Sequence, residues 1–491
     1  MAVATGDERE QKASLSFPRL AVLSHIALLP LALIATLALQ LTTVSHYFYF
    51  DDYVPFGEIV TNGGRTYIWN LLTASDLTPN WRPLPGLLYL GSYEFAGMNP
   101  LPVHIITLAL HVGAAALIYW VIWRTTERAW AASAGALVFG LNPAYVGALS
   151  QVTTATQEMA GFFLIATLAA VVECARANDR RRAAIWVVGA FILYLLVIGS
   201  HEGMAIMFPV FGLAFLTFDP NPAGRLLRSA LRTVPFAAAG LTTAATFVAC
   251  GCNEGTSVWG TADVWNQTLI YTGRLMYPVG LEPPQYVNTA HVAGAAFLAL
   301  IAVVTCVFGP KIARIGVLWI ILALVPHVFI QYATASRYLY IPSIGFALLF
   351  SSAAIMLAAP LARISPRLAV ALAPVLALMM GWYAYQTVQQ DQPFAAATGD
   401  WQRFHRDVTR VFPTVPPHTR VVIIGGPFQL YDYQIAILPA FAQAIWGPDV
   451  TLTDVEPGSL PARIALASES PYLAEYRDGT LVRLHDDAAS H

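Results

Sequence analysis

Two adjacent carboxylates, Asp51 and Asp52, follow a long apolar run and stand among aromatic residues in the stretch FYFDDYVPFGE. Adjacent carboxylates repel each other, and placing both near a membrane surface is costly unless a cation, an arginine or a function retains them. A carboxylate can accept the proton of an attacking hydroxyl group. The pair therefore predicts a general base, with helix capping or plain solvation as structural alternatives. Capping is disfavoured because Pro55 predicts a helix that begins there, with Val54 at the N-cap.

Four arginines fall in segments that we expect on the same side of the membrane as the aspartates, namely Arg65, Arg82, Arg274 and Arg337. A guanidinium group matches phosphate oxygens and keeps its charge. Together with a carboxylate base, such residues favour sugar transfer from a polyprenyl phosphate, in which an acceptor hydroxyl is deprotonated and a phosphate leaves. Arg82, Arg337 and Arg274 are the stronger candidates for binding this donor phosphate. A contact with lipid headgroups or with a loop acid is the alternative for each.

The elements that must position these residues are membrane spans. Of the 491 residues, 57% are hydrophobic and 11% are charged, whereas about a quarter of the residues of a soluble domain are charged. The net charge of −2 suggests no nucleic-acid partner. Runs near the twenty residues that cross a bilayer occur eleven times: 20–44, 101–123, 130–146, 155–172, 183–198, 204–218, 234–250, 291–308, 315–331, 338–361 and 368–388.

The distribution of basic residues predicts the orientation of these spans. If the amino terminus lies inside, sixteen of the 27 basic residues fall in inner segments and four in outer loops, while the rest lie in the tail. The positive-inside rule therefore favours this arrangement. We expect a multi-pass protein of the cell (inner) membrane, with membrane lipids around it and its working face extracytoplasmic.

The expected domain organisation follows from these spans. Residues 1–19 form a cytoplasmic segment, residues 20–388 the transmembrane domain, and residues 45–100 its first outer loop, in which RTYIWNLL and PGLLYLGSYEFAG predict interfacial helices. Residues 389–491 predict a small extracytoplasmic α/β domain: TRVVIIGGP indicates a strand ending in a glycine turn, QLYDYQIAILPAFAQAIWG a helix, and YLAEYRDGTLVRL two strands around an Asp-Gly turn. The fold class is thus an all-α polytopic membrane protein with a small C-terminal α/β domain.

Two motifs carry a resemblance to a known group. The segment NWRPLPGLLYLGSYEFAGMNPLPVHIITLALH pairs Arg82-Pro83-Leu84 with Asn99-Pro100 and two histidines, His104 and His111, and SRYLYIPSIGFALL begins at Ser336. Both resemble segments of the transmembrane protein O-mannosyltransferases that are often fused to TPR repeats. The aspartate pair stands where these enzymes and the wider GT-C superfamily carry an acidic pair in the first outer loop.

This resemblance implies a GT-C fold, a polyprenyl-phosphate sugar donor and inversion at the anomeric carbon. It implies that Asp51 is the base and Asp52 its neighbour, and it adds His201, Glu202, His104 and Tyr338 as candidate active-site residues. His201-Glu202 replaces the Lys-Glu of the group, Ser336 replaces a glutamate, and TPR repeats are absent. The acceptor therefore stays open among protein Ser/Thr, glycan and lipid hydroxyls.

Other readings also stay open. If the first and third outer loops meet, Asp51, Asp52 and Glu202 form an oxygen-rich site for Mg²⁺ or Mn²⁺; no cofactor is otherwise indicated. His104 and His111 lie about 10 Å apart on one helix, too far for a shared metal.

A ligase or polymerase of polyprenyl-linked glycans and a lipid-linked substrate transporter are the alternative functions. The transporter is disfavoured because neither internal repeats nor ionisable residues at the midplane of the spans are evident.

Overall fold

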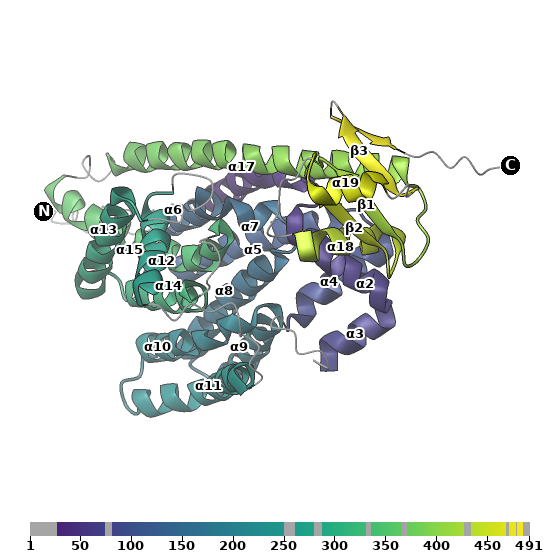
Figure 1. The fold of residues 1–491 in the computed structure, drawn as a ribbon. Helices are drawn as coiled ribbons and strands as arrows, with labels where there is room; N and C mark the ends of the chain where they lie inside the picture. The colour runs from purple at the N-terminus through teal and green to yellow at the C-terminus, as the bar shows by residue number, and fades with distance from the viewer. Residues whose placement is uncertain are drawn as a thin grey trace, which may run out of the picture. The chain divides into compact units, whose positions relative to one another are not determined.

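The computed structural model describes residues 27–73, 81–249, 261–278, 287–329, 335–365, 367, 371–426, 434–467, 471–477 and 479–484. These residues form two compact units. Unit 1 takes the chain up to Leu41 together with Thr107–Ala148 and Gln157–Gln390. Unit 2 takes Thr42–Ile106, Leu149–Thr156 and the segment from Asp391 onward. Helices α5 (Leu101–Thr126) and α17 (Leu372–Val411), labelled in Figure 1, contribute residues to both units.

Unit 1 is helical throughout its described residues. After a helix from Ala27, its elements are α6 (Ala129–Gly140), η3 (Pro143–Tyr145), α8 (Ala155–Arg176), α9 (Arg180–Ser200), η4 (Glu202–Met207), α10 (Phe208–Phe218), α11 (Arg225–Ala249), α12 (Thr261–Met276), α13 (Thr289–Phe308), α14 (Ile312–Val328), η5 (Ser336–Leu339) and α15 (Tyr340–Ile364), and a short α7 (Val146–Ser150) continues from unit 1 into unit 2. The long apolar runs of the sequence therefore form helices, because a helix satisfies every backbone group internally where no water is present.

Seven helices among the described residues are long and apolar enough to cross a membrane: Ala27–Ser45, Leu101–Thr126, Ala129–Ser150, Ala155–Arg176, Arg180–Ser200, Thr289–Phe308 and Ser336–Ile364. Each coincides with one of the predicted spans. The predicted spans 204–218 and 315–331 correspond to the shorter apolar helices Glu202–Phe218 and Ile312–Val328. The remaining two lie largely in α11 and at the start of α17. The chain is a multi-pass membrane protein, and the fold class predicted from its sequence is confirmed.

Helix α13 shows how these helices meet a lipid environment. Large apolar side chains are exposed along it at intervals of three or four residues, including Leu300, Val303 and Val307, which are 58%, 63% and 60% exposed. The opposite side carries the buried residues Leu298 and Thr305. A continuous apolar face of this kind is rare on a protein surface in water. It suits contact with hydrocarbon.

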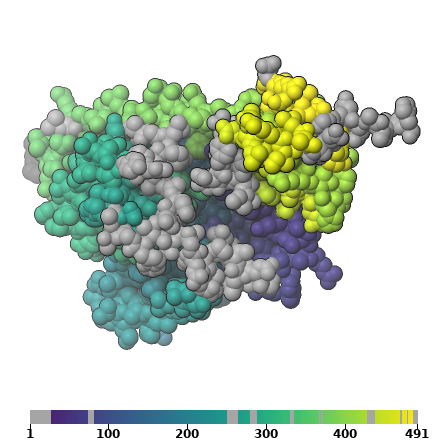
Figure 2. All heavy atoms as spheres, viewed as in Figure 1, coloured from purple at the N-terminus to yellow at the C-terminus, as the bar shows by residue number. Residues whose placement is uncertain are grey.

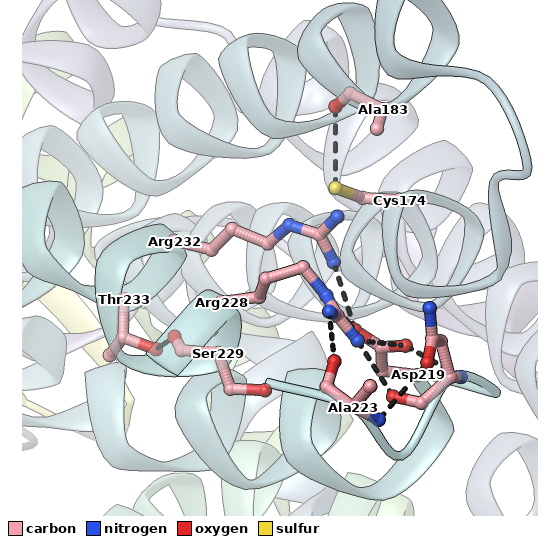
Figure 3. A network of polar contacts seen from close by, with 9 residues as sticks. Cys174, Ala183, Asp219, Ala223, Arg228, Ser229, Arg232 and Thr233 are labelled. Carbon is pink, nitrogen blue, oxygen red and sulfur yellow. Dashed lines mark hydrogen bonds and ion pairs between the residues drawn. The ribbon is translucent and has the colours of Figure 1, made fainter. Parts of the chain in front are cut away.

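A network of ion pairs closes the connection between α10 and α11 (Figure 3). The Nε and Nη2 atoms of Arg228 lie 3.0 and 3.1 Å from the two carboxylate oxygens of Asp219. Arg232 Nη1 lies 3.8 Å from the same carboxylate, and the backbone N–H of Asn221 donates to it at 2.9 Å. Burial raises the pKa of Asp219, but the bonds and charges of Arg228 and Arg232 outweigh it, so the pKa lies below its usual value. This aspartate therefore holds the turn as an ion.

Unit 2 combines helices with a small sheet. The helices are η2 (Phe50–Asp52), α2 (Tyr53–Asn62), α3 (Gly64–Thr73), α4 (Pro83–Ala96), α18 (Gln434–Trp446) and α19 (Leu460–Ala467). The sheet has the order β2 (Thr451–Val455), β1 (Arg420–Ile424), β3 (Leu473–Arg477), β4 (Thr480–Arg483). Strand β1 runs parallel to β2 and β3, and β3 and β4 are antiparallel. The predicted strands and hairpin are confirmed, and Figure 2 shows these C-terminal residues in yellow.

The predicted glycine turn after the first strand is also present. Gly425 has a φ of +69°, and the N–H of Gly426 donates to the carboxylate of Asp454 at 2.9 Å. A Cβ atom at Gly426 would lie 2.6 Å from Asp454 Oδ2. The two glycines therefore form a tight turn that packs against Asp454 of β2.

One aromatic core joins segment 45–73 to the C-terminal segment inside unit 2. The ring of Tyr53 lies 4.8 Å from that of Phe441 and 5.4 Å from that of Trp401, measured between centroids. Helices α2 and α18 approach so closely that a Cβ atom at Gly57 would lie 2.8 Å from the carbonyl oxygen of Ala440. Burial of these rings stabilises the position of α2, and with it the position of the residues that precede α2.

The predicted start of this helix was wrong. Helix α2 begins at Tyr53 rather than at Pro55, and Asp52 occupies its N-cap. Proline is tolerated throughout the first helical turn, where its missing N–H has no partner in any case. The Asp52 side chain makes no capping bond to α2; instead it accepts the N–H of Tyr49 at 2.8 Å.

Candidate functional site

The carboxylate pair lies at the junction of η2, α2 and the connection 149–156. Asp52 is fully buried. Its Oδ1 atom lies 2.7 Å from the backbone nitrogen and 2.8 Å from the hydroxyl of Thr153, both of which donate to it, while Oδ2 accepts the N–H of Tyr49. Asp51 is partly exposed, and its Oδ1 atom lies 3.2 Å from the same hydroxyl. The two neighbours therefore stand in different surroundings.

The pKa of Asp52 reflects this setting. Burial raises it and the charge of Asp51 raises it further, whereas the backbone bonds from Thr153, Tyr49 and Val152 lower it, with a net value of about 7. Two features of the site oppose each other: a buried site disfavours the ion, and the donors favour it. Asp52 thus titrates near neutrality at a position closed to solvent, whereas Asp51 can be reached from outside.

Helix α4 supports the connection that holds the pair. The hydroxyl of Tyr89 donates to the carbonyl oxygens of Thr153 and Val152, at 3.0 and 3.3 Å. Arg82, a predicted phosphate ligand, stands at the N-cap of α4 and is partly exposed, and Pro83 follows at the first helical position. The Arg-Pro-Leu motif therefore begins the helix that braces Thr153. Neither Thr153 nor Tyr89 was identified from the sequence.

A second cluster of polar side chains in unit 2, around His46 and Asp391, was also not predicted from the sequence. Nε2 of the buried His46 lies 3.5 Å from the carboxylate of Asp391. That carboxylate accepts the hydroxyls of Thr42 and Ser150, each at 3.2 Å. The predicted candidate His104 is buried beside it, with its ring 6.4 Å from that of His46 and hydrogen-bonded to the His46 backbone. His104 therefore takes part in a connection between helices.

Unit 1 brings four other predicted residues together. The guanidinium carbon of Arg337 lies 5.5 Å from the centre of the Tyr338 ring. Tyr338 stacks on His327 with 4.4 Å between ring centres, and the His327 ring lies 5.6 Å from that of His201. His201 Nδ1 in turn lies 4.0 Å from a carboxylate oxygen of Glu202. We call these five residues, Arg337, Tyr338, His327, His201 and Glu202, the aromatic row.

Local backbone features place the row. His201 ends α9 and precedes η4, and His327 lies in the last turn of α14. A Cβ atom at Gly203 would lie 3.2 Å from His201 Cε1 and 3.1 Å from Pro326 Cβ, so the glycine permits their approach. His327 is buried and was not predicted, because a single histidine in an apolar run gives no distinctive signal.

The remaining predicted residues of unit 1 are buried. Arg274 has no exposed surface within α12, and it lies near His291 of the neighbouring helix. His111 is fully buried, and its Nδ1 atom lies 3.2 Å from the Tyr340 hydroxyl, so it makes a contact between α5 and α15. Arg65 lies in the first turn of α3, in unit 2.

The described residues contain no group of three or more His, Cys, Asp or Glu side chains that could hold a metal ion. At Asp52 the donor set does not fit a cation, because N–H and O–H groups face both carboxylate oxygens.

Known structures share this fold. The oligosaccharyltransferase of Archaeoglobus fulgidus, in a crystal structure tethered with an acceptor peptide containing the NVT sequon, is similar with a TM-score of 0.53 at 13% identity over 87% of this chain. This chain spans 63% of that protein's length. A weaker likeness, with a TM-score of 0.47 at 12% identity, covers 91% of this chain and 88% of ArnT from Cupriavidus metallidurans bound to undecaprenyl phosphate. No family model and no curated protein matches this chain.

Proposed function

We propose that this chain is an integral-membrane glycosyltransferase of the cell membrane that moves a sugar from a polyprenyl-phosphate donor to an extracytoplasmic hydroxyl acceptor. Asp51 is the general base. The proposal rests on the different surroundings of the two carboxylates. Asp52 is buried and accepts three hydrogen bonds, whereas Asp51 is partly exposed beside it. A base must be open to its substrate, and Asp51 meets this requirement.

The proposed reaction proceeds with inversion. The acceptor oxygen attacks the anomeric carbon, and its proton passes to the Asp51 carboxylate. The bond from the anomeric carbon to the phosphate oxygen breaks, and the polyprenyl phosphate leaves with the bonding electron pair. Arg82 and Arg337 are proposed as ligands of the phosphate, because guanidinium groups stabilise the charge that develops on it. Arg274 has no exposed surface and is therefore the weaker candidate of the three. Mannose is the first sugar to test, because the resemblance of the sequence points to mannosyltransferases.

The aromatic row supports a donor-binding role in unit 1. Arg337 lies over an aromatic ring, which lowers the conformational freedom of its side chain and keeps the guanidinium group in one place. Glu202 and His201 stand at the other end of the row. Sugar hydroxyls form hydrogen bonds with carboxylates and imidazoles, and the row contains both.

The composition of unit 2 supports the proposed orientation. It gathers Thr42–Ile106, Leu149–Thr156 and the chain from Asp391 onward, and the expected orientation of the spans assigns most of these residues to the outer side. The archaeal oligosaccharyltransferase shares the fold, which favours glycosyl transfer by analogy of fold alone.

The test is transfer of a radiolabelled sugar from polyprenyl-phosphate mannose, glucose and other hexoses by the purified protein in nanodiscs. We expect Asp51→Asn to lower the rate by roughly 10²-fold or more, as loss of a general base does, and to leave donor binding within about twofold. The matched control is Asp449→Asn, an exposed aspartate with a φ of +67°, which asparagine adopts readily. Undiminished turnover by the Asp51→Asn protein would overturn the proposal. Transfer from diphosphate-linked glycans alone would favour the ligase alternative.

A further inference from the structure

The connection 149–156 is short, yet Thr153 and Val152 in it both bond to the carboxylate of Asp52, and Tyr49 adds a local bond. Three of the contacts with the two carboxylates come from Thr153 alone. Its backbone N–H and its hydroxyl meet at one oxygen of Asp52, and the hydroxyl also lies 3.2 Å from Asp51. One residue thus touches both carboxylates.

We propose that Thr153 is the positioning residue of the carboxylate pair: its N–H and hydroxyl hold Asp52 as a fixed acceptor, and the same hydroxyl orients Asp51 for proton transfer. This inference rests on the function proposed above. Thr153 has no part in that chemistry itself, because a threonine hydroxyl neither takes the acceptor's proton nor binds the leaving phosphate here.

The position of Thr153 is well fixed. Tyr89 is buried, and its hydroxyl donates to the carbonyl oxygens of Thr153 and Val152. Val152 and the residue that begins the next helix, Ala155, belong to the aromatic core of unit 2. The hydroxyl therefore comes from a rigid support, as the geometry of a proton acceptor requires.

The chemistry of the contact has a direct consequence for titration. The titratable side chains that contact Thr153 include Asp51, Asp52 and Tyr89. Tyr53 follows Asp52 directly, and burial and the charges of Tyr47 and Asp52 raise its pKa. A hydroxyl that donates to a carboxylate favours its ionised form. Removing this donor disfavours the ionised form of Asp52. On acidification, transfer by the variant should therefore begin to fall at a higher pH than transfer by the wild type.

The experiment compares Thr153→Val, which loses the hydroxyl and keeps the N–H, with Thr153→Ser, which keeps both. For Thr153→Val we expect the rate constant for transfer to fall about tenfold and the acid limb of the pH–rate profile to move upward by about half a unit to one unit. The donor KM stays within about twofold, because the phosphate ligands are unchanged. Thr153→Ser restores the wild-type profile.

Two controls make the outcomes separable. Thr398→Val removes another buried hydroxyl of unit 2, one that donates to the carbonyl of Ala395, and should change neither rate nor profile. Thermal unfolding of each variant reports on folding. If Asp51→Asn is inactive while Thr153→Val keeps the wild-type pH profile, the positioning role is overturned and the proposed function stands. If Asp51→Asn is fully active, both are overturned. An equal loss with an unshifted profile in Thr153→Val and Thr398→Val would show a merely structural role and would also overturn the inference.

Discussion

His327 and Tyr338 lie face to face, with ring centres 4.4 Å apart and planes inclined by only 17°. They come from different elements, α14 and η5, and Arg337 lies over the Tyr338 ring. The histidine therefore supports the ring over which a proposed phosphate ligand is placed. Stacked aromatic pairs contribute about 0.5–1.5 kcal/mol beyond the burial of their area.

We expect replacement of His327 by Ala to weaken donor binding. Loss of the stack frees Tyr338 and with it Arg337, so the donor KM should rise by roughly three- to tenfold, which corresponds to the energy of one such pair. The rate constant at saturating donor should change little. Steady-state kinetics with the polyprenyl-phosphate sugar gives both numbers.

The matched variant is His327→Phe, which keeps an aromatic ring of similar shape. It should retain most of the donor affinity. If Ala and Phe at this position raise KM to the same extent, the ring stack has no role in placing Arg337.

The titration of Asp52 predicts a pH dependence of stability. Its pKa is about 7 in the fold, against about 3.9 in an unfolded chain. Because the folded value is the higher one, the folded state binds the proton more tightly. The contribution to the free energy of unfolding is fully present below about pH 4 and is lost as the pH rises through 7. At about 1.4 kcal/mol for each pKa unit, it amounts to at most about 4 kcal/mol.

Thermal unfolding in detergent, measured between pH 4.5 and 8 for the wild type and for Asp52→Asn, tests this sign. The substitution removes the titration, so the difference in melting temperature between the two proteins should shift in favour of Asp52→Asn as the pH rises. A difference that does not vary with pH would contradict the assignment of the raised pKa.

The spans and the C-terminal strands could be predicted because each has a local signal. A run of about twenty apolar residues requires a helix in lipid, and RVVII before a double glycine has the features of a buried strand. The helix start at Pro55 was wrong by two residues, since proline fits any position of the first turn and so does not fix the boundary. Local rules therefore give element types better than their ends.

The partners of the candidate residues could not be predicted in the same way. Asp52 and Thr153 are 101 positions apart, and their contact depends on how the segment around η2 folds onto the connection 149–156. His327 stands in an apolar run without any flanking motif, and only the fold brings it to Tyr338. The candidate residues themselves could be predicted from the sequence, whereas the side chains that orient them are brought into contact only by tertiary packing.

The turn between α10 and α11 should depend on the charge of Asp219. We expect Asp219→Asn to lower the free energy of unfolding by about 2 kcal/mol, since it weakens a two-pronged bond from Arg228 that involves a charged acceptor. The lowered pKa means that the wild type has this contribution above the unfolded value near pH 4 and loses it as the pH falls through the folded value.

Chemical or thermal unfolding at pH 6.5 measures the effect, and Asp400→Asn is its control. Asp400 pairs with Arg403 on an exposed helix face, where such pairs contribute less than about 1 kcal/mol. If both substitutions destabilise the protein equally, the Asp219 network adds no more than a surface pair.

The approach of α2 to α18 gives a prediction for Gly57. A Cβ atom there would lie 2.8 Å from the backbone oxygen of Ala440 and 3.2 Å from its Cα, and backbone atoms cannot move aside as a flexible side chain can. Gly57→Ala should therefore push α18 away from α2 and destabilise unit 2 by about 1–3 kcal/mol. Because α2 follows Asp51 and Asp52 directly, transfer activity should fall with the packing. Limited proteolysis of the C-terminal segment measures the loosening.

Gly91 in α4 provides the matched substitution, because a Cβ atom there would meet nothing within 4 Å. Alanine favours a helix by up to about 1 kcal/mol relative to glycine, so Gly91→Ala should be neutral or stabilising. The contrast between the two sites separates the close backbone contact from the general effect of adding a methyl group to a helix. Equal resistance to protease in both variants would mean that α2 and α18 tolerate a wider separation. In that case the aromatic core around Tyr53 and Phe441 would hold α2 to the C-terminal segment without the close contact between Gly57 and Ala440.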